Sequence, residues 1–429
     1  MVNPRVLAPL ALLAGLTLAP TASAAGRAQE VTWHGNQIKM YAAQPAGRSG
    51  SGVIVAVIDG WVDRAHPDFE GRALAGADCT SGTCVAGQTR DGCTHGTHVA
   101  GTVGSSSFGV APKATILPVR VLADDGKNGC TGTASNVAAG IRWATSHGAK
   151  VENLSLGPGV TGVNSSSDIS TAVTEAAQAG VVVVFSAGNQ DLPVAQSYGN
   201  DALVVAATGP SGQLASYSQR GVGVSVAAPG GDPTNGNCTQ ATCVTSLYPD
   251  NQYAVAAGTS MAAPHVSGMA ALLLGQTPGR SQQNVRDRIT STAHPLSGAG
   301  AGLVDASAAL GVSGTPRPAP APSHVPVIVT KTHQPSAVHV APKPTVKHTA
   351  APPVVKKPQS VNTPLPSASP TASPTPSIAE PPATAAQPLL SPKDKVPLPA
   401  EVAALALLAL AATGVIVTAL RQRAASQST

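Results

Sequence analysis

The segment Val53-Ile-Val-Ala-Val-Ile-Asp59 decides the fold of this chain. Its six apolar residues, most of them β-branched, favour a strand that is buried on both faces, and a single carboxylate follows them. Similar short, largely apolar runs recur downstream at Thr115–Leu122, Val151–Leu156, Val181–Ser186, Ala202–Ala207 and Val224–Ala228. Such runs are typical of a parallel sheet covered by helices. The pattern therefore predicts an α/β fold with a mainly parallel sheet.

Helical stretches separate several of these runs. Asn136–His147 and Ser170–Ala179 have Ala-rich faces, and the glycines that follow them, Gly148 and Gly180, suit helix C-termini. Strands that alternate with helices predict three layers, with the sheet between two layers of helices. Residues 25–311 are numerous enough to bury one large core, so we expect one α/β domain there.

The N-terminal residues have the organisation of a secretory signal peptide. Arg5 supplies a positive charge, Leu7–Leu18 is an apolar run too short to span a bilayer, and Ala22-Ser23-Ala24 is a small-residue cleavage site. We therefore expect residues 1–24 to be a signal peptide and the domain that follows to be exported.

A proline-rich stretch follows the predicted domain. Of the 38 prolines in the chain, 22 fall between Pro316 and Pro399, among many Ala, Ser and Thr residues. This composition cannot bury a core and favours an extended, semi-rigid spacer. We expect residues 312–401 to be a disordered linker.

The C-terminal segment is predicted to cross a membrane once. Val402–Leu420 is a run of 19 residues without a charge, which is long enough for a transmembrane helix. Arg421 and Arg423 follow it, so the positive-inside rule places residues 421–429 in the cytoplasm. The expected location is the cell membrane, with the folded domain outside the cell.

The charge distribution argues against a nucleic-acid partner. The chain has a formal net charge of +5, yet residues 316–399 alone hold eight Lys and Arg residues against two acidic ones. The positive charge of the linker is therefore larger than the net positive charge of the whole chain. The folded domain is close to neutral and lacks the basic surface that nucleic-acid binding requires.

Three residues in separate motifs are suited to nucleophilic catalysis. Asp59 directly follows a strand, His95 opens His-Gly-Thr-His-Val-Ala-Gly, and Ser260 lies in Gly-Thr-Ser-Met-Ala-Ala-Pro-His-Val at the start of a predicted helix, where Pro264 fits only the first turn. A serine hydroxyl becomes a good nucleophile when an imidazole removes its proton, and a carboxylate fixes the tautomer of that imidazole. These residues predict a Ser-His-Asp triad.

Two further groups suit the stabilisation of an oxyanion. The backbone N–H of Ser260 lies at a helix N-terminus, where it can bind developing negative charge. Asn189 offers a side-chain amide, since Phe185-Ser-Ala-Gly-Asn189 reads as a strand that ends in a Gly-Asn turn. Other histidines near these motifs, His98 and His265, are better interpreted as structural.

The order Asp, His, Ser and the sequences of the three motifs resemble the subtilisin family of serine proteases. Trp33 to Lys39 is similar to the start of a mature subtilisin, and Gly300 to Ala309 to the end of the domain. The resemblance implies an endopeptidase in which Asp59 orients His95, the general base and acid.

The same resemblance assigns the remaining roles. Ser260 is the expected nucleophile and Asn189 the oxyanion-hole amide. Asn153 to Gly157 is similar to the segment that lines the substrate cleft in this family, so Ser155, Leu156 and Gly157 are the expected substrate-binding residues. The expected substrates are proteins or peptides.

Two departures from the family affect the aspartate motif and the loop after the histidine motif. Asp59 is followed by Gly60 and Trp61, where most members have Ser or Thr and then Gly, which changes the hydrogen bonding available to the carboxylate. The loop Val103–Phe108 is short, so the loop that binds the strongest calcium ion in the family is expected to be missing. We therefore expect neither a metal ion nor another cofactor.

Six cysteines in an exported chain indicate disulfides. Cys79 and Cys84 bracket one short loop and Cys238 and Cys243 another, and each pair can close locally. In the subtilisin fold the segment before the catalytic His lies near the edge strand that binds substrate, which favours Cys93–Cys130 as the third pair. A zinc site is the alternative, although the spacings do not fit the usual zinc motifs.

The whole layout is similar to that of the mycosins, which are subtilisin-like proteases that accompany type VII secretion in actinobacteria. This similarity rests on the order of signal, protease, Pro-rich spacer, terminal helix and two arginines. It implies the membrane and a type VII secretion complex as partners. A general surface protease has the same features, and a membrane-complex scaffold with incidental protease activity is an alternative.

Overall fold

The computed structural model describes residues 28–127, 129–156, 167–194, 198–317 and 327–329. The expected signal peptide (1–24), most of the expected linker and the expected transmembrane segment (402–420) lie outside these ranges. Among the described residues, no helix is both long and apolar enough to cross a membrane.

An eight-stranded sheet forms the centre of the described domain, with strand order β10-β9-β8-β7-β1-β4-β2-β3. Every neighbouring pair in it is parallel except β2 and β3, which confirms the predicted mainly parallel sheet. Its strands are β1 (Ile54–Asp59), β2 (Ala77–Asp78), β3 (Val85–Ala86), β4 (Thr115–Arg120), β7 (Val151–Leu154), β8 (Val182–Ser186), β9 (Ala202–Thr208) and β10 (Val226–Pro229).

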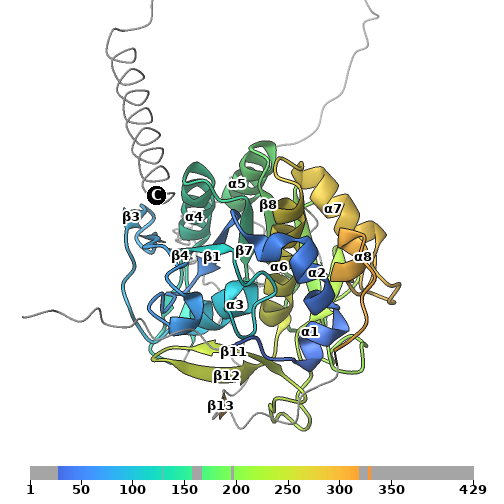
Figure 1. The fold of residues 1–429 in the computed structure, drawn as a ribbon. Helices are drawn as coiled ribbons and strands as arrows, with labels where there is room; N and C mark the ends of the chain where they lie inside the picture. Colours follow the sequence, from blue (N-terminus) through green and yellow to red (C-terminus); the bar gives the residue numbers. More distant parts are fainter. Residues whose placement is uncertain (1–27, 128, 157–166, 195–197, 318–326, 330–429) are drawn as a thin grey trace, which may run out of the picture. The chain divides into compact units, whose positions relative to one another are not determined.

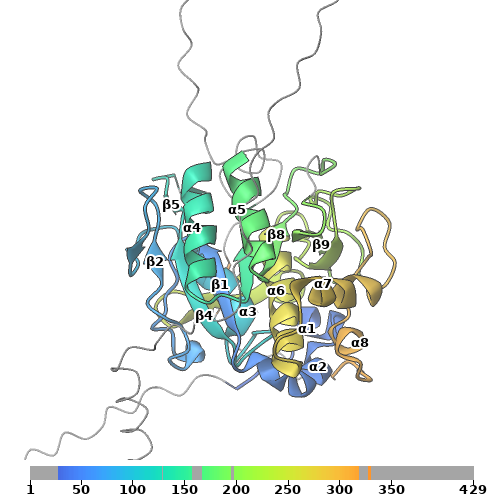
Figure 2. The same cartoon turned by 90° about the horizontal axis from the view of Figure 1, so that it is seen from above.

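Helices cover both faces of the sheet, as Figures 1 and 2 show. On one face lie α3 (His95–Gly104) and the long α6 (Thr259–Gln276), while α4 (Ala134–Ser146) and α5 (Ser167–Gln178) lie on the other. The remaining helical segments are α1 (Trp33–Gln37), α2 (Met40–Ala46), α7 (Gln282–Ser291), α8 (Ala306–Leu310) and the short 3₁₀ turns Arg48–Gly50 and Pro67–Phe69. The predicted three-layer arrangement is confirmed.

Strand β1 shows how the sequence produces two cores. Val55 and Val57 pack in the core under α3 and α6, whereas the alternate residues Ala56 and Ile58 pack in the core under α4 and α5. This alternation follows from the two-residue period of a strand. Burial on both faces fixes the register of β1 and places Asp59 at its carboxyl end, where open α/β sheets hold their functional residues.

Two smaller sheets complete the described structure. Strands β11 (Val244–Tyr248) and β12 (Gln252–Ala256) form an antiparallel hairpin, and β13 (Val327–Val329) pairs with β12 in parallel. Strands β5 (Ala123–Asp124) and β6 (Cys130–Thr131) form a second hairpin. The proline-rich stretch thus contains a short strand, which its composition does not indicate.

Candidate active site

Asp59 and His95 form a hydrogen-bonded pair between the end of β1 and the start of α3. His95 Nδ1 lies 2.8 Å from Asp59 Oδ1, the Asp59 carboxylate is fully buried, and the His95 side chain is 13% exposed. Because the carboxylate can only accept, the proton of the neutral imidazole is on Nδ1, which leaves Nε2 free to act as a base. Burial opposes protonation of the ring, but the charge and hydrogen bond of Asp59 outweigh it and raise the pKa of His95.

The backbone around Asp59 holds its carboxylate in place. The Gly60 N–H donates to Asp59 Oδ1 over 2.6 Å, and the Asp59 carbonyl accepts from the N–H groups of Val121 and Leu122. The second carboxylate oxygen, Oδ2, is buried without a partner. With Gly60 after the aspartate, the next side chain offers no hydroxyl to this oxygen, which is the consequence expected from that departure.

Ser260 lies in the first turn of α6 and is bonded to Ser155 rather than to His95. Its hydroxyl donates to the Ser155 carbonyl over 3.1 Å, while His95 Nε2 is buried without a partner. Catalytic hydrogen bonds are often formed only when substrate binds. A shift of the Ser260 hydroxyl to His95 Nε2 would give the imidazole its missing partner and complete the triad.

Pro264 strengthens the link between Ser260 and Ser155. It lies in the second turn of α6, not in the first turn as predicted. Because proline has no N–H, it cannot donate to the Ser260 carbonyl four residues earlier. The Ser155 hydroxyl donates to that carbonyl instead, over 2.8 Å. Ser155 and Ser260 are thus joined by two reciprocal hydrogen bonds.

Asn189 lies at the turn after β8, beside the start of α6. Its Oδ1 accepts from the backbone N–H and the hydroxyl of Thr259, over 2.9 and 2.8 Å. A backbone N–H can only donate, so the side-chain oxygen must face Thr259 and the amide NH₂ is left to donate elsewhere. Gly188, with φ of 109°, makes the turn that brings Asn189 here. The Asn189 amide and the N-terminal N–H groups of α6 therefore form the kind of donor pair that stabilises an oxyanion.

The expected substrate-binding segment follows β7. Ser155 and Leu156 are buried there, and Gly157 lies outside the described residues. Asn153 supports the segment, since its Nδ2 donates to Ser155 Oγ and its Oδ1 accepts from Ser267 Oγ on α6. The end of β7 is therefore fixed to the helix that carries Ser260.

The other two motif histidines, His98 on α3 and His265 on α6, are buried and are not placed to act as bases. His265 Nδ1 contacts the Met261 carbonyl at 2.8 Å, and its Nε2 lies 3.0 Å from Nδ1 of His34, a residue that the sequence did not single out. Burial lowers the pKa of His265 to about 4 and that of His98 to about 3. Both rings are therefore neutral near pH 7, in agreement with a structural role.

The cysteines form three disulfides, in the pairing that the sequence analysis predicts: Cys79–Cys84, Cys93–Cys130 and Cys238–Cys243. No cysteine is free, so the zinc alternative, which needs cysteine thiolates, is wrong. In the described part of the chain, no group of three or more His, Cys, Asp or Glu residues is arranged to hold a metal ion.

Hydrogen bonds hold the short loop after α3. The Ser107 hydroxyl donates to the Asp68 carboxylate, the Ser106 N–H donates to the Asp68 carbonyl, and the Phe108 N–H donates to the Ser105 hydroxyl. These hydrogen bonds connect the loop to Asp68 and to the end of α3.

The comparisons with known proteins agree with this geometry. The family model described as "Subtilase family" matches residues 50–318. Subtilisin BL from Lederbergia lenta is 38% identical over 295 residues, which cover 66% of this chain and 99% of that protein. Thermitase from Thermoactinomyces vulgaris is 40% identical over 259 residues, which cover 58% of this chain and 84% of that protein.

Solved structures give the same result. A cold-adapted subtilisin-like serine proteinase matches with a TM-score of 0.51 and 33% identity, over 60% of this chain and 88% of that one. A protease from Pseudoalteromonas arctica matches with a TM-score of 0.55 and 31% identity, over 66% of this chain and 99% of that one. The protein is therefore a serine endopeptidase and belongs to the subtilase family.

Proposed function

We propose that Ser260, His95 and Asp59 hydrolyse peptide bonds through an acyl-enzyme. His95 Nε2 removes the proton of the Ser260 hydroxyl as the oxygen attacks the peptide carbonyl, and Asp59 stabilises the imidazolium that results. The Asn189 amide and the Ser260 N–H bind the oxyanion. His95 then gives its proton to the leaving amine, and water repeats the sequence to release the acid.

The observation that carries this proposal is the Asp59–His95 pair. It combines a buried carboxylate, a 2.8 Å hydrogen bond to Nδ1, and an Nε2 atom that is buried without a partner. The Ser260 hydroxyl donates to the Ser155 carbonyl and has to leave that carbonyl in order to bond the imidazole. His95 is therefore an oriented base that can accept a proton on Nε2, and the nucleophile, Ser260, lies in the first turn of a helix.

Covalent labelling tests the assignment. Ser260→Ala should abolish both labelling by a fluorophosphonate and peptidase activity, and His95→Ala should reduce both nearly as much, because nucleophile and base act as one unit. Ser146→Ala is the control, since Ser146 lies on α4, on the other face of the sheet, and donates to the Trp143 carbonyl. Labelling that persists in Ser260→Ala would contradict the assignment.

We further propose that the enzyme works outside the cytoplasm, anchored in the cell membrane by residues 402–420. Support comes from the sequence alone: the signal-like residues 1–24, the Pro-rich residues 312–401, the uncharged segment and the two arginines after it. The same order supports a mycosin-like role beside a type VII secretion complex. The alternatives are a general surface protease and a membrane-complex scaffold whose protease activity is incidental.

Truncation after Pro399 tests the anchor and the role together. The shortened protein should move from the membrane fraction to the medium, because the predicted anchor is removed. It should keep its activity on small peptides, because residues 400–429 contain none of the proposed site residues. A truncated protein that remains at the membrane would contradict anchoring by residues 402–420. Loss of cleavage of a natural partner with unchanged peptide cleavage would favour the mycosin-like role, and cellular function retained by Ser260→Ala would favour the scaffold.

A further inference from the structure

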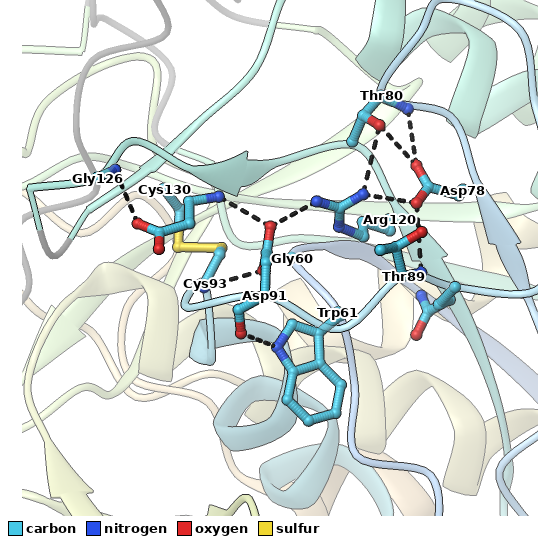
Figure 3. Close-up of polar contacts among 12 residues, drawn as sticks. Gly60, Trp61, Asp78, Thr80, Thr89, Asp91, Cys93, Arg120, Gly126 and Cys130 are labelled. Atoms are coloured by element: carbon cyan, nitrogen blue, oxygen red, sulfur yellow. Dashed lines mark hydrogen bonds and ion pairs between the residues drawn. A yellow bond between two sulfur atoms is a disulfide. The ribbon is translucent and has the colours of Figure 1, made fainter.

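One aspartate outside the triad contacts four separate parts of the chain around it (Figure 3). The Asp91 carboxylate accepts from the N–H of Cys93 over 3.0 Å, from the N–H of Asp124 over 2.9 Å, and from the Arg120 guanidinium. Its backbone carbonyl accepts from Nε1 of Trp61 over 2.7 Å. None of the chemical steps proposed above uses Asp91.

Three of these contacts lead directly to the Asp59–His95 pair. Cys93 precedes His95 by two residues and enters α3, while Trp61 follows Asp59 by two residues. Arg120 is the direct register partner of Asp59 on the neighbouring strand β4. Asp91 therefore contacts three segments around the pair. Its carboxylate binds the strand end beside Asp59 and the entry to the helix that begins with His95, and its backbone carbonyl binds the loop that leaves Asp59.

Close packing lets little movement occur between these segments. A Cβ atom on Gly60 would lie 2.3 Å from Cys93 Sγ and 2.7 Å from the Cys93 carbonyl, and one on Gly96 would lie 2.5 Å from the Gly60 carbonyl. Real Cβ atoms do not approach so closely, so the loop after Asp59 lies directly against the Cys93–Cys130 disulfide and the first turn of α3. This contact also explains why a glycine follows Asp59.

The guanidinium that binds Asp91 is itself held between two carboxylates. Arg120 is 6% exposed and donates to Asp78 through Nη1 and to Asp91 through Nη2. Asp78 also accepts from the N–H and hydroxyl of Thr80. Buried ion pairs of this kind fix geometry, and removing one partner is costly. Of the two carboxylates, only that of Asp91 is bonded to the entry of α3.

We propose that Asp91 is a positioning residue that keeps His95 at hydrogen-bonding distance from Asp59. The proposal rests on the catalytic roles proposed above for that pair. Two titratable groups act on the His95 ring: Asp59 from β1, and His98 one turn further along α3, which burial keeps neutral. Asp91 is not among them, so its influence on the imidazole has to pass through geometry.

This route has a measurable consequence. Asp59 raises the pKa of His95 through its charge and its hydrogen bond, against the opposing effect of burial. If the entry of α3 loosens, the Asp59–His95 bond lengthens and burial prevails, so the pKa of His95 falls. The acidic limb of kcat/KM, which reports the ionisation of the essential base in the free enzyme, then moves to lower pH. A residue that only stabilised the fold would not move it.

The test compares Asp91→Ala and Asp91→Asn with Asp78→Asn in the full chain. Asp91→Ala should lower kcat by roughly 10- to 100-fold, the loss expected when a catalytic group is misplaced, and should shift the acidic limb to lower pH. Asp91→Asn keeps one acceptor oxygen and should show smaller changes in the same direction. Asp78→Asn, which removes the same charge from the same arginine, should lower the melting temperature and leave kcat and the acidic limb unchanged.

Other outcomes would overturn the proposal. If the Asp91 variants lower only the melting temperature, as Asp78→Asn does, Asp91 is a structural residue. If Asp78→Asn shifts the acidic limb as much as Asp91→Ala, the effect belongs to Arg120 and not to the entry of α3. If Asp91→Ala does not fold, the values of kcat and of the acidic limb measured for Asp91→Asn test the proposal instead. Failure of the catalytic assignment itself would be recognised separately, by labelling of Ser260→Ala.

Discussion

Two fully buried carboxyl groups, Asp59 and Glu152, lie on adjacent strands of the same sheet and have very different surroundings. Asp59 ends β1 and accepts from an imidazole and a backbone N–H. Glu152 lies inside β7, in register with Ala56 and Val183, and accepts only from the Thr145 hydroxyl, over 2.8 Å. In both, the second oxygen is buried without a partner.

The difference is the kind of partner that each group has. Asp59 faces an imidazole that can become charged, and raises its pKa. Glu152 faces the helices α4 and α5 with a neutral hydroxyl as its donor, and burial raises its pKa to about 8, which Thr145 only partly opposes. Complete burial of a carboxyl therefore does not identify a catalytic residue. The carboxyl that we propose to be catalytic lies at a strand end beside a titratable base.

The largest expected difference between the two carboxyl groups is the effect of their substitution on kcat. Asp59→Asn should lower kcat by roughly 10⁴-fold, because an amide favours the wrong tautomer of His95 and leaves its cation unpaired. Glu152→Gln should leave kcat within about twofold, since Glu152 contacts no group of the site. Both variants keep the shape of the side chain, and kcat measured on one peptide substrate compares them directly. A large loss of activity in Glu152→Gln would break the comparison.

The sequence predicts the strands and the motif residues well because both carry local signals. Each of the six apolar runs overlaps a strand of the sheet, with ends that differ by at most two residues, as β4 (Thr115–Arg120) illustrates against the predicted Thr115–Leu122. Asp59, His95 and Ser260 lie within recognisable motifs at strand and helix ends. Their location could be predicted because open α/β sheets hold their functional residues at the carboxyl ends of the strands.

Contacts between distant segments could not be predicted in the same way. The hydroxyl of Ser260 bonds Ser155, 105 residues away, and His265 contacts His34, 231 residues away. Such pairs depend on the strand order and on how α6 packs, neither of which leaves a local pattern. The Asp91 contacts are of the same type: an aspartate two residues before a cysteine reads as an ordinary loop residue until the ends of β1 and β4 are known to be neighbours.

The smaller effect expected from the comparison is the pH dependence of stability. The pKa of Glu152 is raised in the folded protein, whereas in the unfolded chain it has its ordinary value of 4.5. The stability that its protonated form contributes is therefore complete below about pH 4.5 and is lost as the pH rises through about 8, by roughly 1.4 kcal/mol per pH unit between these limits. Glu152→Gln removes the titration, so the variant should gain about 3 kcal/mol over wild type on going from pH 4.5 to pH 7.

Urea unfolding at pH 5, 6, 7 and 8 measures this difference, with Ser260→Ala as the common background so that self-digestion does not obscure the unfolding curves. The free energies of unfolding with and without Glu152→Gln should diverge steadily with rising pH. Glu175→Gln on α5 is the matched control, because Glu175 is exposed and paired with Arg142, where a surface ion pair contributes little. Parallel pH profiles with and without Glu152→Gln would mean that the carboxyl ionises without cost inside the fold. Burial would then have the same consequence at β7 as at β1, and the contrast between the two carboxyls would rest on activity alone.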